Sequence, residues 1–263
     1  WRYVDHDETG RFLVWGKVSV GQNTSLYAVD TVGATVTKLV AVGDTIDGFQ
    51  TASITVAQTS GYGDDGVAVF AATATGPGVG DGILTQTSKI ARKGDTIDGY
   101  TLQQPNTPRR SPDGVIYFLS EGRLFKHPLN GLNALLLGPG RSVAGQPIDA
   151  VLSHSVNMDE RIAFEATLVG ADGVFLDEQA VAISNVTEIN GIPVVRVGHE
   201  YPSIVSVNAS GQVAFVAQRQ GETAAIYVAT LDLSFDSNGD GTVDQDDFVA
   251  FVDCDQGGGS LTE

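Results

Sequence analysis

Apolar and polar residues alternate over short distances along most of the chain, and glycine interrupts the pattern at close intervals. The apolar runs are short and rich in Val, Ile, Phe and Tyr, as in "RFLVW" (residues 11–15) and "GVAVF" (residues 66–70). Before residue 245, no stretch keeps a helical period over three turns. Short runs of β-branched and aromatic residues between turn residues are typical of strands. The pattern therefore predicts an all-β protein.

Two series of strands recur five times each. The first is an apolar strand that closes on an aromatic residue: Trp15, Phe70, Phe118, Phe164 and Phe215. The second carries a bulky pair: Leu26-Tyr27, Ile83-Leu84, Leu124-Phe125, Val174-Phe175 and Ile226-Tyr227. Turn-rich segments such as "SPDG" (residues 111–114) and "SVNASG" (residues 206–211) precede the aromatic strands. The series indicate an internal repeat of about fifty residues.

A third element of the repeat is almost identical in two copies, "GDTIDGF" (residues 43–49) and "GDTIDGY" (residues 94–100). "GRSVAG" (Gly140–Gly145) is interpreted as a degraded third copy, and "VRVGHEYP" (Val195–Pro202) as a candidate fourth. Each phrase follows a strand of the type "VAVGD", so that every unit contains four short strands in a fixed order. The fifth unit has no clear "VAVGD" strand, and "LDLSF" (Leu231–Phe235) is its only candidate.

Four short antiparallel strands in each repeat of roughly 40–50 residues are typical of a β-propeller blade. One such sheet leaves an apolar face that only a neighbouring blade can cover, and this shared packing problem explains why the same phrase recurs. The predicted fold is an all-β propeller of about five four-stranded blades over residues 1–231, with a short calcium-loop and helix module at residues 232–263.

Charge and composition narrow the function. The 263 residues include 32 acidic and 15 basic side chains, a net charge of −17, which argues against a nucleic-acid groove and against an anionic membrane surface. No run approaches the length of a membrane span. The only cysteine, Cys254, has no partner for an intrachain disulfide. The chain opens on Trp1 without a charged and apolar leader, and we therefore expect a mature or excised segment.

The segment "DSNGDGTVDQDD" (Asp236–Asp247) has the spacing of a calcium loop. Its oxygen ligands would be Asp236, Asn238, Asp240, the backbone carbonyl of Thr242, Asp244 and Asp247. Gly241 would make the sharp turn at the sixth position. Alternate side chains of a tightly wound loop converge on one point, and Ca²⁺ accepts six to eight oxygens. The alternative is a merely acidic, solvated tail, since residues 232–263 contain no Lys or Arg.

The calcium loop resembles the dockerin type I repeat, because "DSNGDGTVDQDDFVAF" (Asp236–Phe251) lacks an incoming helix and has Asp at the twelfth position. The resemblance implies bound Ca²⁺, a short helix with Phe248, Phe251 and Val252 on one face, and cohesin recognition through Gln245 and Asp246. A dockerin has two repeats and only one is present here. The second repeat could have been removed, or a single repeat could cap the propeller.

"SPDGVIYFLSEGRLFKHPLNG" (Ser111–Gly131) resembles the blades of exported bacterial propellers of the TolB and six-bladed lactonase type. The resemblance implies an exported protein that is secreted or at the cell surface. Propellers serve as enzymes, lectins and scaffolds, so this resemblance constrains the fold more than the chemistry.

The central channel is the natural active site of a propeller. Alignment of the blades on their aromatic residues places His6, Arg109, Ser155 and Ser206 at one position of the approach strand, with His154 beside it. A cluster of His6, Arg109 and His154 could bind an anionic sugar or transfer protons. A one-residue error in register would turn a side chain away from the channel, and such residues at propeller rims are commonly structural.

Two functions follow from these features, and a third, an intermediate-filament-like or pilus building block formed by edge pairing of an open ring, rests only on the incomplete fifth blade. The first is a binding and scaffold protein whose propeller face binds a glycan or a protein, with the calcium loop docking to a cohesin-like partner or capping the propeller. The second is a carbohydrate-active lyase or hydrolase that carries a dockerin. Convergence of His6, Arg109 and His154 in one pocket would favour the enzyme.

Overall fold

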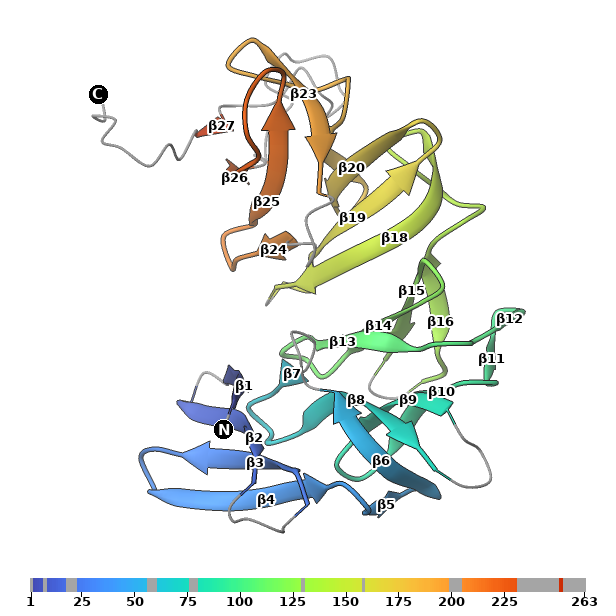
Figure 1. The fold of residues 1–263 in the computed structure, drawn as a ribbon, viewed down its shortest axis with the longest axis vertical. Helices are drawn as coiled ribbons and strands as arrows, with labels where there is room; N and C mark the ends of the chain where they lie inside the picture. Colours follow the sequence, from blue (N-terminus) through green and yellow to red (C-terminus); the bar gives the residue numbers. More distant parts are fainter. Residues whose placement is uncertain are drawn as a thin grey trace. The chain divides into compact units, whose positions relative to one another are not determined.

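The computed structural model describes residues 2–6, 9–17, 23–55, 61–75, 80–128, 131–157, 159–198, 205–230 and 251–252. These residues form strands and turns, and the described part contains no helix, so none that could cross a membrane. The chain divides into two compact units, unit 1 (Trp1–Gly138) and unit 2 (Pro139–Glu263). The described strands form five antiparallel sheets of four or more strands and one separate two-stranded sheet (Figure 1). The fold is therefore the all-β propeller that the sequence predicts.

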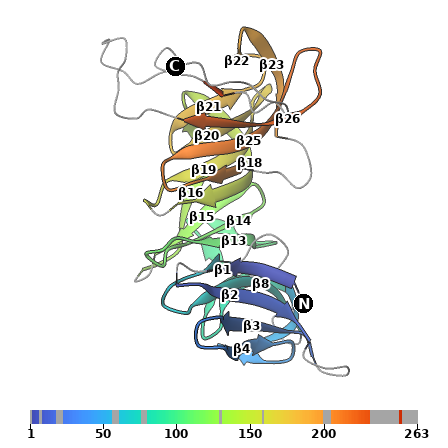
Figure 2. The same ribbon diagram turned by 90° about the vertical axis from the view of Figure 1, so that its left-hand side faces the viewer.

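Unit 1 contains three blades. Blade 1 consists of β1 (Arg2–His6), β2 (Arg11–Gly16), β3 (Ser25–Asp30) and β4 (Thr35–Ala41). Blade 2 consists of β6 (Phe49–Thr55), which continues as β7 (Gly61–Tyr62), then β8 (Ala68–Ala74), β9 (Gly80–Thr85) and β10 (Lys89–Arg92). Blade 3 consists of β13 (Asn106–Arg110), β14 (Ile116–Ser120), β15 (Arg123–His127) and β16 (Ala134–Leu137). Figure 2 shows the four strands of blade 1 side by side in sequence order.

Unit 2 contains two blades. Blade 4 consists of β18 (Gln146–Val156), β19 (Ile162–Leu168), β20 (Ala171–Leu176) and β21 (Gln179–Ile183). Blade 5 consists of β23 (Ile192–Val197) and β24 (Val205–Val207), which both pair with β25 (Gln212–Arg219), then β26 (Ala225–Thr230) and β27 (Phe251–Val252). The first strand of each blade is called its inner strand below.

The fourth strand of blade 5 differs from the prediction. Phe251 and Val252 pair with Ala229 and Val228 of β26, so these two residues lie in a strand rather than on the expected helix. The edge of a strand has unpaired backbone N–H and C=O groups. Aromatic and β-branched residues favour the extended conformation, in which their backbone can pair with such an edge. The other parts of that prediction, "LDLSF" (Leu231–Phe235) and Phe248, lie outside the described residues.

The repeated phrase forms a two-residue hairpin before the inner strand of blades 2 to 5. These linking hairpins are residues 45–50, 96–101, 142–147 and 188–193, built around β5 (Thr45–Ile46), β11 (Thr96–Ile97) with β12 (Tyr100–Thr101), β17 (Ser142–Val143) and β22 (Glu188–Ile189). Their central pairs have positive φ at both residues: Asp47-Gly48, Asp98-Gly99, Ala144-Gly145 and Asn190-Gly191. This is the type I′ turn, whose twist matches that of the flanking strands.

The hairpins confirm one predicted copy of the phrase and correct another. The copy in Gly140–Gly145 is confirmed, because Ser142 and Val143 pair with Pro147 and Gln146. The fourth copy is residues 188–193 and not Val195–Pro202. The reason is that the turn needs a residue tolerant of positive φ followed by glycine, which Asn190-Gly191 supplies.

Three apolar clusters lie between consecutive blades within the units. Leu13 and Leu26 of blade 1 share a cluster with Phe70 and Leu84 of blade 2. The cluster between blades 2 and 3 contains Val69, Ile83, Phe118 and Phe125. The cluster between blades 4 and 5 contains Ala163, Val174, Phe215 and Tyr227. Each linking hairpin buries one residue, and Ile46, Ile97 and Ile189 belong to these three clusters in turn. These three isoleucines therefore fill space between two consecutive blades.

The predicted aromatic residue occupies the equivalent position of the second strand in blades 2 to 5, and in blade 1 it is shifted by one residue. A residue of positive φ precedes each second strand, namely Gly10, Gly66, Gly114, Glu160 and Gly211. Four positions later stand Phe70, Phe118, Phe164 and Phe215 in blades 2 to 5, but Val14 in blade 1. Val14 also pairs with Tyr27, the second residue of the bulky pair, as the phenylalanines do with their own partners. Trp15 is thus one residue beyond the equivalent position.

Candidate functional site

The predicted calcium ligands Asp236, Asn238, Asp240, Thr242, Asp244 and Asp247 lie outside the described residues. Gln245 and Asp246, where cohesin recognition is expected, lie there as well. Within the described residues, no group of three or more His, Cys, Asp or Glu side chains is placed to hold a metal ion. The calcium site therefore stays a prediction from the sequence.

The channel candidates belong to the first strands of their blades, and one of them differs in register from the sequence alignment. Arg109, Ser155 and Ser206 occupy equivalent positions, opposite Tyr117, Ala163 and Ala214. In blade 1 this position belongs to Asp5, opposite Leu13, and His6 pairs with Phe12 one residue later. The shift follows from Val14 replacing Trp15 as the reference residue of blade 1.

The three residues proposed for a channel cluster belong to different units. His6 and Arg109 are in unit 1, and His154 is in unit 2. His154 lies on β18 opposite Phe164 and is 4% exposed. His127 has a structural setting, because its Nδ1 is 2.9 Å from Oδ1 of Asn133, whose Nδ2 donates to the carbonyl oxygen of Ile90. A catalytic role for His6, Arg109 and His154 stays a prediction.

The inner strands end in turns that share one pattern of backbone hydrogen bonds. In blades 2 to 5 these inner-strand turns are residues 63–67, 111–115, 157–161 and 208–212. In each turn the first N–H donates to the fifth carbonyl, and the fourth N–H donates back to the first carbonyl. The fourth residue has positive φ in all four turns. These hydrogen bonds fix the loop backbone at one end of every described blade except the first, where residues 7 and 8 are not described.

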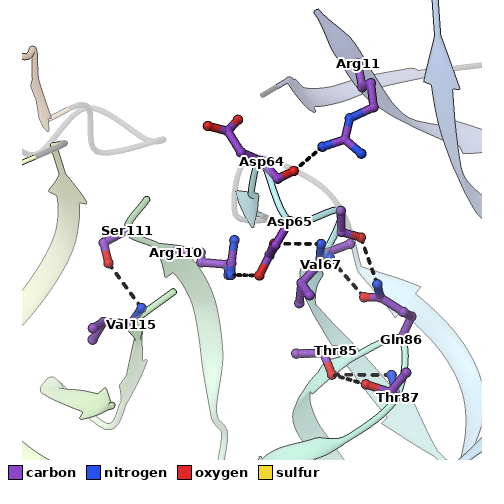
Figure 3. Close-up of polar contacts among 12 residues, drawn as sticks. Arg11, Asp64, Asp65, Val67, Thr85, Gln86, Thr87, Arg110, Ser111 and Val115 are labelled. Atoms are coloured by element: carbon purple, nitrogen blue, oxygen red, sulfur yellow. Dashed lines mark hydrogen bonds and ion pairs between the residues drawn. The ribbon is translucent and has the colours of Figure 1, made fainter. Parts of the chain in front are cut away.

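Two arginines from neighbouring blades hold the inner-strand turn of blade 2 (Figure 3). Arg110 of blade 3 donates from Nη2 to Oδ2 of Asp65 at 2.6 Å, and Arg11 of blade 1 donates from Nη2 to the carbonyl oxygen of Asp64. Gln86 holds the same turn from within blade 2, because its Nε2 donates to the carbonyl oxygen of Gly66. The turn is therefore tied to three blades.

The setting of Arg110 explains two glycines of blade 2. The Arg110 side chain is 4% exposed, whereas Asp65 is 51% exposed. A Cβ atom at Gly63 would lie 1.4 Å from Nη1 of Arg110, and one at Gly61 would lie 2.7 Å from the Arg110 Cβ. The absence of side chains at these two positions lets the guanidinium group lie directly on the backbone of β7 and its turn.

Unit 2 ties its turns together in an equivalent way. Asn157 of blade 4 donates from Nδ2 to the carbonyl oxygen of Asn208 in blade 5. Arg161 stands where Arg11 stands in blade 1, and its Nη1 would lie 3.1 Å from a Cβ at Gly211, as Nη1 of Arg11 would lie 3.4 Å from one at Gly66. Asp177 anchors Arg161 through Nε at 2.9 Å. The structure thus repeats a polar clamp between consecutive blades.

Unit 2 also buries a carboxyl group that the sequence analysis did not single out. Glu165 on β19 is 1% exposed, and Ser153 donates from Oγ to its Oε2 at 3.4 Å. A Cβ at Gly198 would lie 1.8 Å from Oε1, so the glycine makes room for the carboxyl group. The equivalent residues of blades 2, 3 and 5 are Ala71, Leu119 and Val216. An acidic residue directly after the aromatic one was the available signal.

The chemistry of these elements is that of a preorganised surface. Carboxylates, amides and guanidinium groups gather at the inner-strand turns, and hydrogen bonds between blades hold their backbones in place. Fixed polar groups bind a ligand without the cost of ordering a mobile loop.

Comparisons with known proteins add little about function. No family model matches the chain, and no curated protein matches it. Among solved structures, TolB from Acinetobacter baumannii is 13% identical with a TM-score of 0.47, and the match covers 84% of this chain and 49% of TolB. The Dos1 propeller is 11% identical with a TM-score of 0.38, covering 82% and 50%. A luciferin-regenerating enzyme is 11% identical with a TM-score of 0.38, covering 83% and 73%. The chain spans about half the length of TolB and of the Dos1 structure.

Proposed function

We propose that the chain is a secreted or cell-surface binding and scaffold protein. On this proposal the inner-strand turns of each unit present a polar propeller face that binds a glycan or a protein. The loop at residues 236–247 binds Ca²⁺ and either docks to a cohesin-like partner or caps the propeller. The acidic balance of the chain argues against nucleic acid as the ligand.

The observation that carries the proposal is the repeated clamp at the inner-strand turns. In both units, a side chain of one blade hydrogen-bonds the turn of a neighbouring blade, through Arg110 to Asp65 in unit 1 and through Asn157 to Asn208 in unit 2. A turn that only closes a hairpin needs no support from neighbouring blades. Support of this kind is expected where the turns have to present polar groups in fixed positions.

A binding screen tests the propeller face. The chain would be applied to an array of neutral and anionic glycans, and each bound glycan would then be titrated against the variants Asp64→Ala and Asp113→Ala, both in inner-strand turns. Glu188→Ala is the matched control, because Glu188 is an exposed acid in a linking hairpin, at the other end of the inner strand. We expect the turn variants to weaken binding by about tenfold each, on the scale of one lost polar contact. Equal affinity of all three variants would contradict the proposed binding face.

Calcium titration tests the second half of the proposal. Ca²⁺ would be titrated calorimetrically into chelator-treated protein, and the parent compared with Asp236→Ala/Asp240→Ala. The control is Asp113→Ala, which removes an exposed carboxylate far along the chain from the loop. We expect one site with a dissociation constant of about 10⁻⁵ M or below, because the loop offers six oxygen ligands in EF-hand spacing. Retention of that site in the double variant, or no binding by the parent, would refute the calcium assignment.

A carbohydrate-active enzyme is the second candidate, and one observation favours it. Glu165 is a carboxyl group buried at 1% exposure next to the Ser153 hydroxyl, in a position that is apolar in three other blades. Buried carboxyl groups recur as acids and bases in glycoside and lyase chemistry. Polygalacturonate would be incubated with the chain and with Glu165→Gln, and formation of the unsaturated product followed by ultraviolet absorbance. Turnover that Glu165→Gln abolishes would support the enzyme, and absence of turnover by the parent would remove lyase action on this substrate.

A further inference from the structure

The fourth strand of each blade is called its outer strand, and its last backbone N–H has a side-chain acceptor in blades 1, 2 and 4. The N–H of Ala41 donates to Oδ2 of Asp44 at 2.8 Å, and the N–H of Arg92 donates to Oδ2 of Asp95 at 2.9 Å. In blade 4 the hydroxyl oxygen of Thr187 accepts the equivalent hydrogen bond at 2.9 Å. An oxygen atom from the segment that follows the outer strand therefore satisfies this N–H in three blades.

Blade 3 lacks this acceptor. Gly138 stands at the equivalent position, because it directly follows Leu137, which pairs with Leu124. Gly138 is buried, and its N–H donates no hydrogen bond to any residue that the structure describes. Three residues later, at the sequence position that carries aspartate after blades 1 and 2, the chain has Arg141. A buried backbone N–H without an acceptor is rare, so this position indicates a missing oxygen ligand.

The neighbouring strand of blade 3 places an arginine beside Gly138. A Cβ at Gly138 would lie 2.7 Å from Cγ of Arg123, so the glycine makes room for this side chain. Within the described residues, Arg123 makes one hydrogen bond, from Nη1 to the carbonyl oxygen of Glu121 at 3.2 Å, and its Nε is buried without an acceptor. The carboxylate of Glu121 accepts instead from the N–H of Gln103 and from Oγ of Ser120. Arg123 is therefore a half-buried guanidinium group without a carboxylate partner in the described part of the chain.

Arginine at this position distinguishes blade 3 from the other blades. The residue before the bulky pair is small in all four of them: Ser25, Gly82, Gly173 and Ala225. The guanidinium group of Arg123 lies over the ring of Tyr100, with Cζ 4.4 Å from the ring centroid. Stacking on the ring fixes the plane of the guanidinium group before a ligand arrives, which lowers the entropic cost of binding.

Blade 2 shows how a carboxylate satisfies such a pair of donors. There the arginine is on the outer strand and the glycine on the third strand, since Arg92 pairs with Gly82. Asp95 accepts the backbone N–H of Arg92 through Oδ2 at 2.9 Å and the Nε of the same residue through Oδ1 at 3.3 Å. One carboxylate thus bridges an outer-strand N–H and an arginine Nε. Blade 3 has both kinds of donor in Gly138 and Arg123, and neither has such an acceptor among the described residues.

We propose that blade 3 binds the carboxylate group of an external ligand, which accepts the N–H of Gly138 and pairs with Arg123. A carboxylate is the favoured anion because Asp44 and Asp95 supply that group at the equivalent positions of blades 1 and 2. Tyr100 belongs to the linking hairpin that precedes β13, whereas the inner-strand turn of blade 3 follows β13. The site is therefore separate from the binding face of the proposed function and does not depend on it.

Titration of the chain with sodium glucuronate, followed through the ¹H–¹⁵N resonance of the Gly138 amide, tests the proposal. We expect a saturable shift of this resonance with a dissociation constant of about 10⁻³ M, on the scale of one charge-assisted pair, and no such shift with neutral glucose. Arg123→Met should weaken binding at least about tenfold, because the ligand loses its cationic partner. The control is Arg92→Met, since Arg92 already pairs with Asp95, and its affinity for glucuronate should equal that of the parent.

Arg123→Lys keeps the comparison valid if Arg123→Met fails to fold. Lysine retains the positive charge but lacks the planar fork of donors, so its affinity should lie between those of the parent and Arg123→Met. The midpoint of urea unfolding shows whether each variant is folded. A parent whose Gly138 resonance does not respond to glucuronate would overturn the proposal, as would folded Arg123 variants that bind as tightly as the parent.

Acetate in place of glucuronate shows how much of the ligand the site recognises. Tighter binding of glucuronate would mean that the sugar ring adds contacts, and equal binding would mean that the carboxylate alone is recognised; both results support the site. The turn variants Asp64→Ala and Asp113→Ala should leave this titration unchanged. Failure of the carboxylate site and failure of the proposed binding face are therefore distinguishable.

Discussion

The linking hairpins of unit 1 and those of unit 2 share one backbone conformation but little sequence. Both hairpins of unit 1 have the sequence Thr-Ile-Asp-Gly, whereas the two hairpins of unit 2 have the sequences Ser-Val-Ala-Gly and Glu-Ile-Asn-Gly. All four have positive φ at the two central residues and a buried aliphatic residue just before them. All four hairpins therefore keep the turn conformation and the buried aliphatic residue, whereas the polar residues around them vary.

Truncation of the buried isoleucine of a linking hairpin should have the largest effect on stability. Ile189 is 0% exposed within the cluster between blades 4 and 5, and Ile189→Ala should cost about 3 kcal/mol of unfolding free energy. Ile97→Ala, in the corresponding cluster of unit 1, should cost a similar amount. Urea denaturation measures both. Val186→Ala is the control, since Val186 is 54% exposed and should change stability by less than about 0.5 kcal/mol. A small loss at either isoleucine would break the equivalence of the units.

Backbone conformation should have the next largest effect. Gly99 and Gly145 have φ of 83° and 72°, and a Cβ at either would meet no atom within 4 Å. Alanine at either position should therefore cost about 1–2 kcal/mol through left-handed backbone strain alone. Thermal or urea unfolding of Gly99→Ala and Gly145→Ala measures the two losses. Losses that differ by more than about 1 kcal/mol would show that the two hairpins are not held in one conformation.

The polar residues of the two hairpins in unit 1 should affect stability more weakly. Asp98 accepts a hydrogen bond from the Leu135 N–H through Oδ2 at 2.7 Å, which ties the hairpin to the outer strand of blade 3. Asp98→Ala should cost about 1–2 kcal/mol in urea unfolding, because a partly buried N–H loses its acceptor. At Asp47, for which the structure shows no such bond among the described residues, Asp47→Ala should cost about 0.5 kcal/mol. Equal costs would remove this difference between the two copies of the phrase.

The smallest effect should be a gain. Ala144 has φ of 46° in a position where the other hairpins carry Asp or Asn. Ala144→Asn should stabilise the chain by about 0.5–1 kcal/mol, because asparagine tolerates the left-handed region better than alanine. Ala209→Asn is the control, an exposed turn position without positive φ, which should change the midpoint of unfolding little. Destabilisation by Ala144→Asn would mean that neighbouring groups, and not φ, select the residue.

Much of the fold could be predicted from the sequence because the blade is a local structure. Phe118 and Phe125, separated by one tight turn, pair and stack at 5.4 Å between ring centroids, as their two series imply. The spacing of the aromatic residues did not identify the equivalent residue in blade 1, where the register differs by one residue. Trp15 is the aromatic nearest the expected place, but the positive φ of Gly10 sets the register and gives that place to Val14. The same shift moves Asp5 into the position predicted for His6.

The candidate site could be predicted less well. The calcium ligands Asp236 to Asp247 rest on loop spacing alone, and no described residue bears on them. The ion pair between Arg110 and Asp65 joins residues 45 positions apart. No local sequence pattern indicates that Gly61 and Gly63 leave the space that the Arg110 side chain occupies. Glu165 directly follows Phe164 in the sequence, but the strand pattern does not show that its carboxyl group is buried.

The sequence by itself determined the all-β class, the second and third strands of the blades and the place of the two hairpins that carry Asp-Gly. These features depend on side-chain period and on backbone φ, which act over a few residues. Only the tertiary structure decided which glycines make room for a neighbouring side chain and which carboxyl group is buried. These depend on contacts between blades, where burial is a property of two surfaces and cannot be read from either one alone.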